Sequence, residues 1–236
     1  MKFAATVLAF ACIPLAAQTS PATHGASASV ALSPAATATS TASQIAPPQT
    51  IDTSVGFSYS LPADWEILAS KPTKPDVPFP AVEGPKRGNA CAQVELTARH
   101  GVPPSVVVIA ALPFDCYGQV LTTKNLPEFA AGAAEGLKQT FEVADPVIGN
   151  YSLGSHKMWI ERAKGTVKGQ ANSKYTLEIA CTVLAKGAAC WMAMAADAAS
   201  LQTFEQQAVT LEGEMFDAIV PASAFQAPAS APSKPS

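Results

Sequence analysis

Two long stretches of low complexity limit which part of this chain can fold. Residues 18–50 and 221–236 consist largely of Ala, Ser, Thr and Pro. Segments of this composition have too little apolar surface to offset the entropy lost on ordering. We therefore expect a disordered linker and a disordered C-terminal tail around one domain at 51–220, whose roughly 170 residues fit the usual size of a single domain.

The first seventeen residues predict a signal peptide. Lys2 gives a basic start, residues 3–15 are mostly apolar but too few to cross a bilayer, and Ala16–Ala17 supply small residues for cleavage before Gln18. The residues before Cys12 do not resemble a lipidation site, so we expect no lipid anchor there. No later segment is apolar over the roughly 20 residues that a spanning helix needs. The protein is expected to be exported, as a periplasmic or secreted protein without a transmembrane segment after cleavage.

Four cysteines follow the expected cleavage site: Cys91, Cys116, Cys181 and Cys190. An even number in an oxidising compartment predicts two disulfides, for which three pairings exist. Residues 184–187 read as a hairpin turn that would place Cys181 beside Cys190, leaving Cys91 to pair with Cys116. We predict this pairing, with the other two left open.

The pattern of apolar residues predicts an α+β domain. Alternation indicates strands, and apolar residues at helical spacing indicate a helix that begins after Asn125 and runs to Phe141, and a second that runs from about Leu201 to Leu211. The expected strands are 55–61, 65–68, 92–98, 106–112, 158–167, 175–184 and 188–195. The prediction is an antiparallel sheet with two main helices packed on it.

The start of this domain, Gly56-Phe57-Ser58-x-x-Leu61-Pro62-x-x-Trp65, and the order of the expected elements resemble the PsbP-like superfamily. The resemblance covers most of residues 55–220. It implies an α/β/α sandwich and a non-enzymatic binding or scaffold module, since members include photosystem assembly subunits, a regulator of a small nuclear GTPase and exported bacterial proteins. It carries no functional residue over, and the four cysteines depart from the superfamily's pattern.

The chain carries no recognisable catalytic, cofactor or metal motif. Its three histidines, His24, His100 and His156, are far apart, and there is no Cys-x-x-Cys. No Gly-x-Ser-x-Gly elbow and no Gly-rich phosphate loop is present. Alternation places Glu178 opposite its apolar neighbours, where we expect solvent. The basic residues are scattered, which excludes a typical nucleic-acid-binding face. We expect no catalytic residue, cofactor or metal.

One apolar set on neighbouring strands is a candidate surface for a ligand or partner: Trp159, Trp191, Met192, Met194 and Tyr175. Alternation turns Trp191 away from Met192 and Met194, so the set cannot share one buried face. Core packing is the alternative interpretation. The Pro-rich stretch 71–87 is either a binding loop or an ordinary connection.

These features predict an exported, non-catalytic binding or scaffold protein for a protein partner or a small apolar ligand. The alternative is an exported hydrolase-type enzyme whose site comes from residues distant in sequence, which a pocket containing Ser, His and a carboxylate would favour. A thiol redox protein is a third possibility and requires an accessible cysteine of low pKa.

Overall fold

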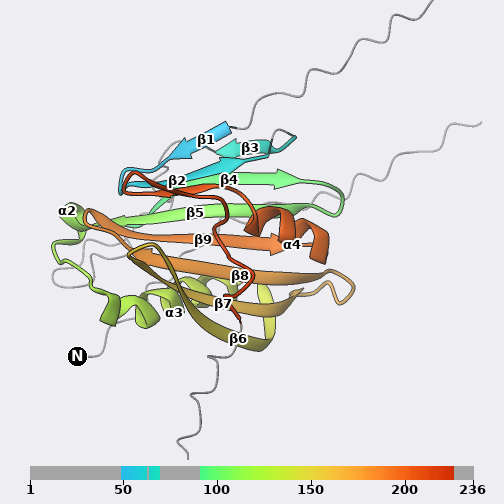
Figure 1. Ribbon diagram of the computed structural model, residues 1–236. Coiled ribbons are helices and arrows are strands. Elements are labelled where there is room, and N and C mark those ends of the chain that lie inside the picture. The colour runs from blue at the N-terminus through green and yellow to red at the C-terminus, as the bar shows by residue number, and fades with distance from the viewer. Residues whose placement is uncertain (1–48, 63, 70–90, 226–236) are drawn as a thin grey trace, which may run out of the picture.

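The computed structural model describes residues 49–62, 64–69 and 91–225 (Figure 1). The expected signal peptide, the linker up to residue 48, the Pro-rich stretch 71–87 and the tail from 226 onward lie outside the described residues. The strands are β1 (Gln49–Asp52), β2 (Phe57–Leu61), β3 (Glu66–Ala69), β4 (Gln93–His100), β5 (Ser105–Pro113), β6 (Phe141–Leu153), β7 (His156–Val167), β8 (Lys174–Val183), β9 (Gly187–Ala195), β10 (Val209–Leu211) and β11 (Glu214–Phe216). The helices are α2 (Phe114–Tyr117), the 3-10 helix η2 (Thr123–Asn125), α3 (Leu126–Leu137) and α4 (Ala198–Glu205).

Seven strands form one antiparallel sheet in the order β3-β4-β5-β9-β8-β7-β6. The expected strands 92–98 and 106–112 are β4 and β5, and the expected strands 158–167, 175–184 and 188–195 are β7, β8 and β9. The central strands β5 and β9 are buried along almost their whole length. Such continuous burial requires that both faces of the sheet are covered.

Helix α3 covers one face of this sheet, behind the strands in Figure 1. Its buried residues, among them Leu126, Ala130 and Leu137, recur at helical spacing and pack against Met192 and Ile179 of the sheet. The predicted helix is therefore present, but it ends at Leu137 rather than at Phe141. Asn125 does not cap α3 with its side chain, which instead accepts hydrogen bonds from Thr122 at the start of η2.

A second, four-stranded sheet in the order β1-β2-β10-β11 covers the other face together with α4. Phe57 and Tyr59 of β2, Phe204 of α4 and Trp191 of β9 belong to the core between these layers. The Tyr59 hydroxyl donates to the Phe204 carbonyl oxygen at 2.9 Å. The α+β class is confirmed. The helix–sheet–helix sandwich is correct only in part, because a small sheet shares the second face with the helix.

The second helix is shorter than predicted, since α4 ends at Glu205 and residues 209–211 form β10 against β2. Leu201, Phe204 and Leu211 are all buried, as their spacing indicated. For Leu211, burial is compatible with a helix or with a strand. Its pairing with β2 makes it part of a strand.

The edge strand β6 was not predicted, because Asp145-Pro146 reads as a turn. In the structure this dipeptide lies within β6, at a point where the pairing with β7 shifts between Ala144 and Val147. Asp145 has a φ of 52° there. This is a β-bulge on an edge strand, which is one of the places where a sheet tolerates proline.

The structure contains both expected disulfides, Cys91–Cys116 and Cys181–Cys190. Cys181 and Cys190 are direct partners on β8 and β9, with Cα atoms 4.1 Å apart, and both are buried beneath α3. Cys91 is also buried, in a small cluster with Leu112 and Phe114, although its partner Cys116 is exposed. The Cys91–Cys116 bridge therefore has one cysteine in a small secondary core and the other at the surface.

Among the residues described, no helix combines the length and the hydrophobicity required to cross a bilayer.

Candidate functional site

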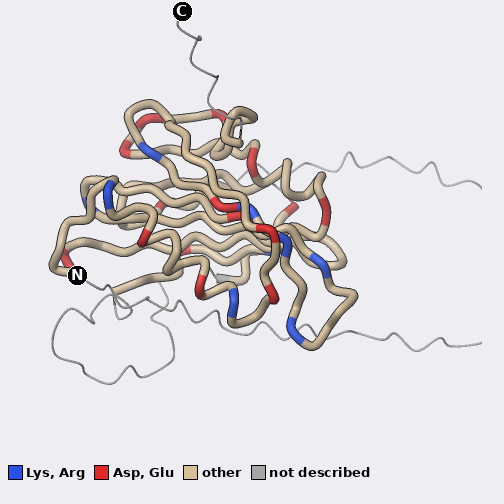
Figure 2. Tube along the Cα trace, turned by 90° about the horizontal axis from the view of Figure 1, so that it is seen from below, with Lys and Arg blue, Asp and Glu red and all other residues tan. Residues whose placement is uncertain are grey.

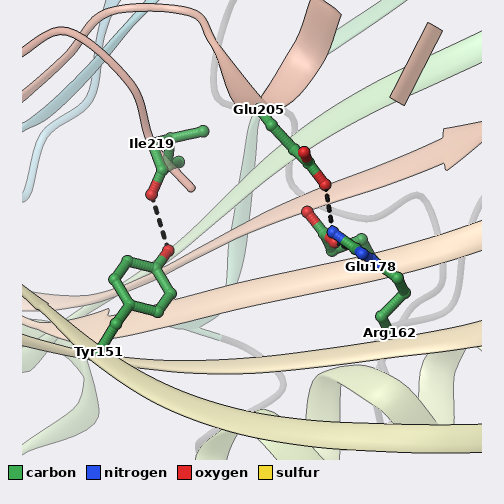
Figure 3. A network of polar contacts seen from close by, with 5 residues as sticks. All are labelled: Tyr151, Arg162, Glu178, Glu205 and Ile219. Carbon is green, nitrogen blue, oxygen red and sulfur yellow. Dashed lines mark hydrogen bonds and ion pairs between the residues drawn. The ribbon is translucent and has the colours of Figure 1, made fainter. Parts of the chain in front are cut away.

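A group of charged side chains lies between the main sheet and the layer in front of it (Figure 3). Arg162 on β7 and Glu178 on β8 are direct cross-strand neighbours, and Glu205 is the last residue of α4. Arg162 Nε donates to Glu178 Oε2 at 2.6 Å, and an Nη atom of Arg162 donates to Glu205 Oε1. One guanidinium thus joins two carboxylates from different layers.

Glu178 is the buried member of this network, with 0% of its side chain exposed. The expectation of solvent around Glu178 is therefore wrong. Its alternation with Leu177 and Ile179 is as predicted, but α4 and the C-terminal residues cover the face on which it lies. Alternation along a strand assigns a side chain to one face of the sheet, but only the packing of other layers decides whether that face is exposed to solvent.

Burial, and after it the negative charge of Glu205, raises the pKa of Glu178 to about 8 against the lowering effect of Arg162. Glu178 Oε1 has no hydrogen-bond partner among the described residues. A buried carboxylate oxygen without a partner is costly while it is charged. One proton on Glu178 leaves a single carboxylate for the single guanidinium, so the network is best balanced in that form.

The C-terminal segment, residues 217–225, crosses the sheet over this network. The Tyr151 hydroxyl donates to the Ile219 carbonyl oxygen at 2.7 Å, and burial and the nearby carboxylates raise the pKa of Tyr151. The Phe225 ring lies 4.2 Å from Arg162 Cζ. A Cβ atom at Gly149 would lie 2.7 Å from the Ala224 carbonyl oxygen, so the segment needs glycine at that position. The contacts of Arg162 and Tyr151 therefore hold this segment against the sheet.

A pocket of about 240 Å³ lies on the opposite face, where α3 begins beside the left-hand ends of β6 and β7 in Figure 1. We call it the Trp159 pocket. Its wall combines the half-buried Trp159 with apolar residues of α3 and with polar side chains of the two strands. The lining residues are Thr123, Leu126, Pro127, Asn150, Tyr151, Ser152, Lys157, Met158 and Trp159.

The structure separates the five residues of the predicted apolar surface. Trp191 and Met192 have 0% of their area exposed and lie in the cores on opposite faces of the sheet. Met194 and Tyr175 are also buried. Trp159 is the member of the set that lines the Trp159 pocket, whereas the other four side chains pack into the cores. Asn150 and Ser152, two of the polar residues around it, were not predicted because they lie on β6, a strand that was not predicted.

The described residues contain no group of three or more His, Cys, Asp or Glu side chains arranged to hold a metal ion. His100 Nε2 lies 2.9 Å from an Asp64 carboxylate oxygen, and His156 Nδ1 lies 3.8 Å from one of Glu212. His24 is outside the described residues. Acidic and basic residues are interspersed along the described trace (Figure 2).

No protein-family model matches the chain, and no curated protein matches it. Among solved structures, the chain is similar to the solution structure of cyanobacterial PsbP (CyanoP) from Synechocystis sp. PCC 6803. The identity is 13%, the match covers 66% of this chain and 84% of that chain, and the TM-score is 0.36. A TM-score of this size supports no argument about function or membership.

Proposed function

We propose that this chain is an exported, non-catalytic binding protein whose recognition site is the Trp159 pocket. The observation that carries the proposal is the position of Trp159, which stays half-buried in the wall of an open pocket while the other candidate side chains pack into the cores. Ligand sites typically combine apolar walls with a few convergent polar groups. The Trp159 pocket has this composition.

Export is part of the proposal and is supported by the N-terminal seventeen residues and by the disulfides. All four cysteines after the expected cleavage site are paired, which suits an oxidising compartment. Their pairing also argues against a thiol redox protein, since such a protein needs an accessible thiolate. PsbP-like membership remains proposed on the opening motif, of which Phe57, Leu61 and Trp65 are buried in the core.

The alternative, a hydrolase-type enzyme, would draw on the cluster of sequence-distant charged groups Arg162, Glu178 and Glu205. The Glu178 carboxyl has no exposed area, and none of the three residues lines the Trp159 pocket. A catalytic acid or base must reach the proton that it transfers. The network therefore favours a role in stability over one in catalysis.

A screen of small molecules against the exported protein tests the proposal, with saturation-transfer NMR to detect bound ligands. The pocket-filling variant Asn150→Trp places a bulky ring at an exposed lining position and should abolish binding. The control Glu142→Trp puts the same ring on β6 at an exposed position outside the pocket and should keep it.

The proposal fails if no compound binds, or if both tryptophan variants bind ligands as well as the unchanged protein does. Turnover of simple esters that is lost in Glu178→Gln would establish the hydrolase instead.

A further inference from the structure

We infer that the Trp159 pocket binds small organic carboxylates, with the carboxylate paired to Lys157 and the apolar body lying against Trp159. This inference rests on the proposed function and specifies its ligand class.

The charge of the pocket is positive. Lys157 is the one residue with a formal charge among the nine described residues that line it. The chain as a whole has 18 Asp and Glu residues against 15 Lys and Arg residues. A wall with a cation and without a carboxylate thus differs from the average of this acidic chain, and it selects for a negative ligand group.

The hydrogen-bond partner of Lys157 is a neutral hydroxyl, so the positive charge of the ammonium remains available to a ligand. Lys157 Nζ donates to Ser152 Oγ at 2.9 Å, and no carboxylate among the described residues lies within 4.0 Å of it. Lys164 also lies on β7 next to β6, but its ammonium pairs with the Asp145 carboxylate at 3.1 Å. The β6–β7 hairpin therefore neutralises one lysine and not the other. An ammonium with three donors and a single neutral acceptor retains two donors for a ligand.

The remaining wall suits the rest of such a ligand. The Asn150 amide and the Thr123 hydroxyl, both exposed at the rim, can donate hydrogen bonds to a carboxylate. Trp159 Nε1 is buried and has no partner among the described residues, so the accessible part of the indole is its carbon surface. Leu126 and Pro127 extend this apolar wall.

The size of the pocket limits the ligand. Its volume of about 240 Å³ lies below the roughly 300–1,000 Å³ of pockets for drug-sized molecules. It therefore takes a compact molecule or the end of a longer one. A free monocarboxylic acid and the C-terminal carboxylate of a peptide share this chemistry.

The test is a titration of the exported protein, followed by the indole N–H signal of Trp159 in two-dimensional NMR, which the variant Trp159→Phe assigns. The probes are phenylacetate and hexanoate with their uncharged amides, and a tripeptide that ends in Phe with a free or an amidated C-terminus. Each acid should bind about 1.4- to fivefold more tightly than its amide, the range expected of one exposed ion pair. Tighter binding of phenylacetate or hexanoate identifies a free monocarboxylic acid as the ligand, and tighter binding of the tripeptide identifies a peptide C-terminus.

The variant Lys157→Gln should remove this preference while both members of each pair still bind. The control Lys174→Gln, an exposed lysine of β8 outside the pocket, should keep it. Equal binding of acids and amides, with loss of both in Asn150→Trp, would overturn the carboxylate assignment and leave the binding function standing. Absence of binding by every probe and by every compound in the screen would overturn both.

Discussion

Arg162 Nε and Glu178 Oε2 are 2.6 Å apart on neighbouring strands, and the carboxyl of this pair has no exposed area. With Glu205 as a second acceptor, the guanidinium holds α4 against the sheet at the point where the C-terminal segment crosses it. The stability of this junction should depend on charge and on close packing, and the first three predictions concern it.

Replacement of Glu178 by glutamine should remove a pH dependence of stability. The folded-state pKa of Glu178 is raised from 4.5 to about 8, so the folded protein keeps this proton to higher pH than the unfolded chain does. The stabilisation is complete below pH 4.5 and is lost as the pH rises toward 8. From pH 5 to pH 9, the unchanged protein should lose at least about 1.4 kcal/mol relative to Glu178→Gln, the equivalent of one pKa unit.

Urea denaturation at both pH values measures this difference. Glu135→Gln, at an exposed residue paired with Lys138, should show no comparable change. Parallel stability profiles for Glu178→Gln and the unchanged protein would contradict the raised pKa.

Removal of the guanidinium should be costly above the pKa of Glu178. The variant Arg162→Met leaves two carboxylates without their cation, and the loss of one partner of a buried pair costs about 3–5 kcal/mol. The loss should be largest at pH 9 and smaller at pH 5, where protonation relieves the repulsion. The double variant Arg162→Met, Glu178→Leu should recover much of it. Chemical denaturation of these three proteins and of the single variant Glu178→Leu completes the double-mutant cycle.

The control is Lys164→Met on the same strand, which breaks an exposed pair with Asp145 and should cost under about 1 kcal/mol. If Arg162→Met and Lys164→Met lose a similar free energy of unfolding, burial of the network contributes nothing to stability.

A side chain at Gly149 should displace the C-terminal segment. The Cβ atom of Gly149→Val would meet the Ala224 carbonyl oxygen at 2.7 Å and Ile160 Cγ2 at 3.1 Å. Overpacking of this kind costs about 1–3 kcal/mol. We expect a lower melting temperature and faster proteolytic cleavage after residue 217, followed by mass spectrometry. Ile148→Val, at the exposed neighbouring position, should leave both unchanged, and an unaltered cleavage pattern in Gly149→Val would exclude the displacement.

The two disulfides should differ in their resistance to reductant. Cys181 and Cys190 are 0% and 1% exposed under α3, whereas Cys116 is exposed. Under limiting dithiothreitol in native buffer, alkylation and peptide mapping should therefore detect Cys91 and Cys116 as free thiols first. The order should disappear in urea, because unfolding exposes both bridges. Earlier labelling of Cys181 or Cys190 in native buffer would contradict the burial.

Much of the main sheet could be predicted because its signals are local. Alternation located β7, β8 and β9, and the short turn between the last two placed Cys181 beside Cys190. The site was predicted less well. Trp159 was singled out, but Lys157, Asn150 and Ser152 were not. Asn150 and Ser152 were missed because the turn signal of Asp145-Pro146 concealed β6. A bulge in β4 similarly places both Glu95 and Leu96 in buried positions, which regular alternation does not allow.

The sequence by itself determined the α+β class and most strands of the main sheet, and it favoured the cysteine pairing that the structure contains. These features follow mainly from the order of residues within short segments. Only the tertiary structure decided which faces are covered. Residues 209–211 are a strand because β2 lies beside them, and Glu178 is buried because α4 and the C-terminal segment lie over it. Such contacts join residues far apart in the chain, and periodicity records the face to which a side chain points but not what packs against that face.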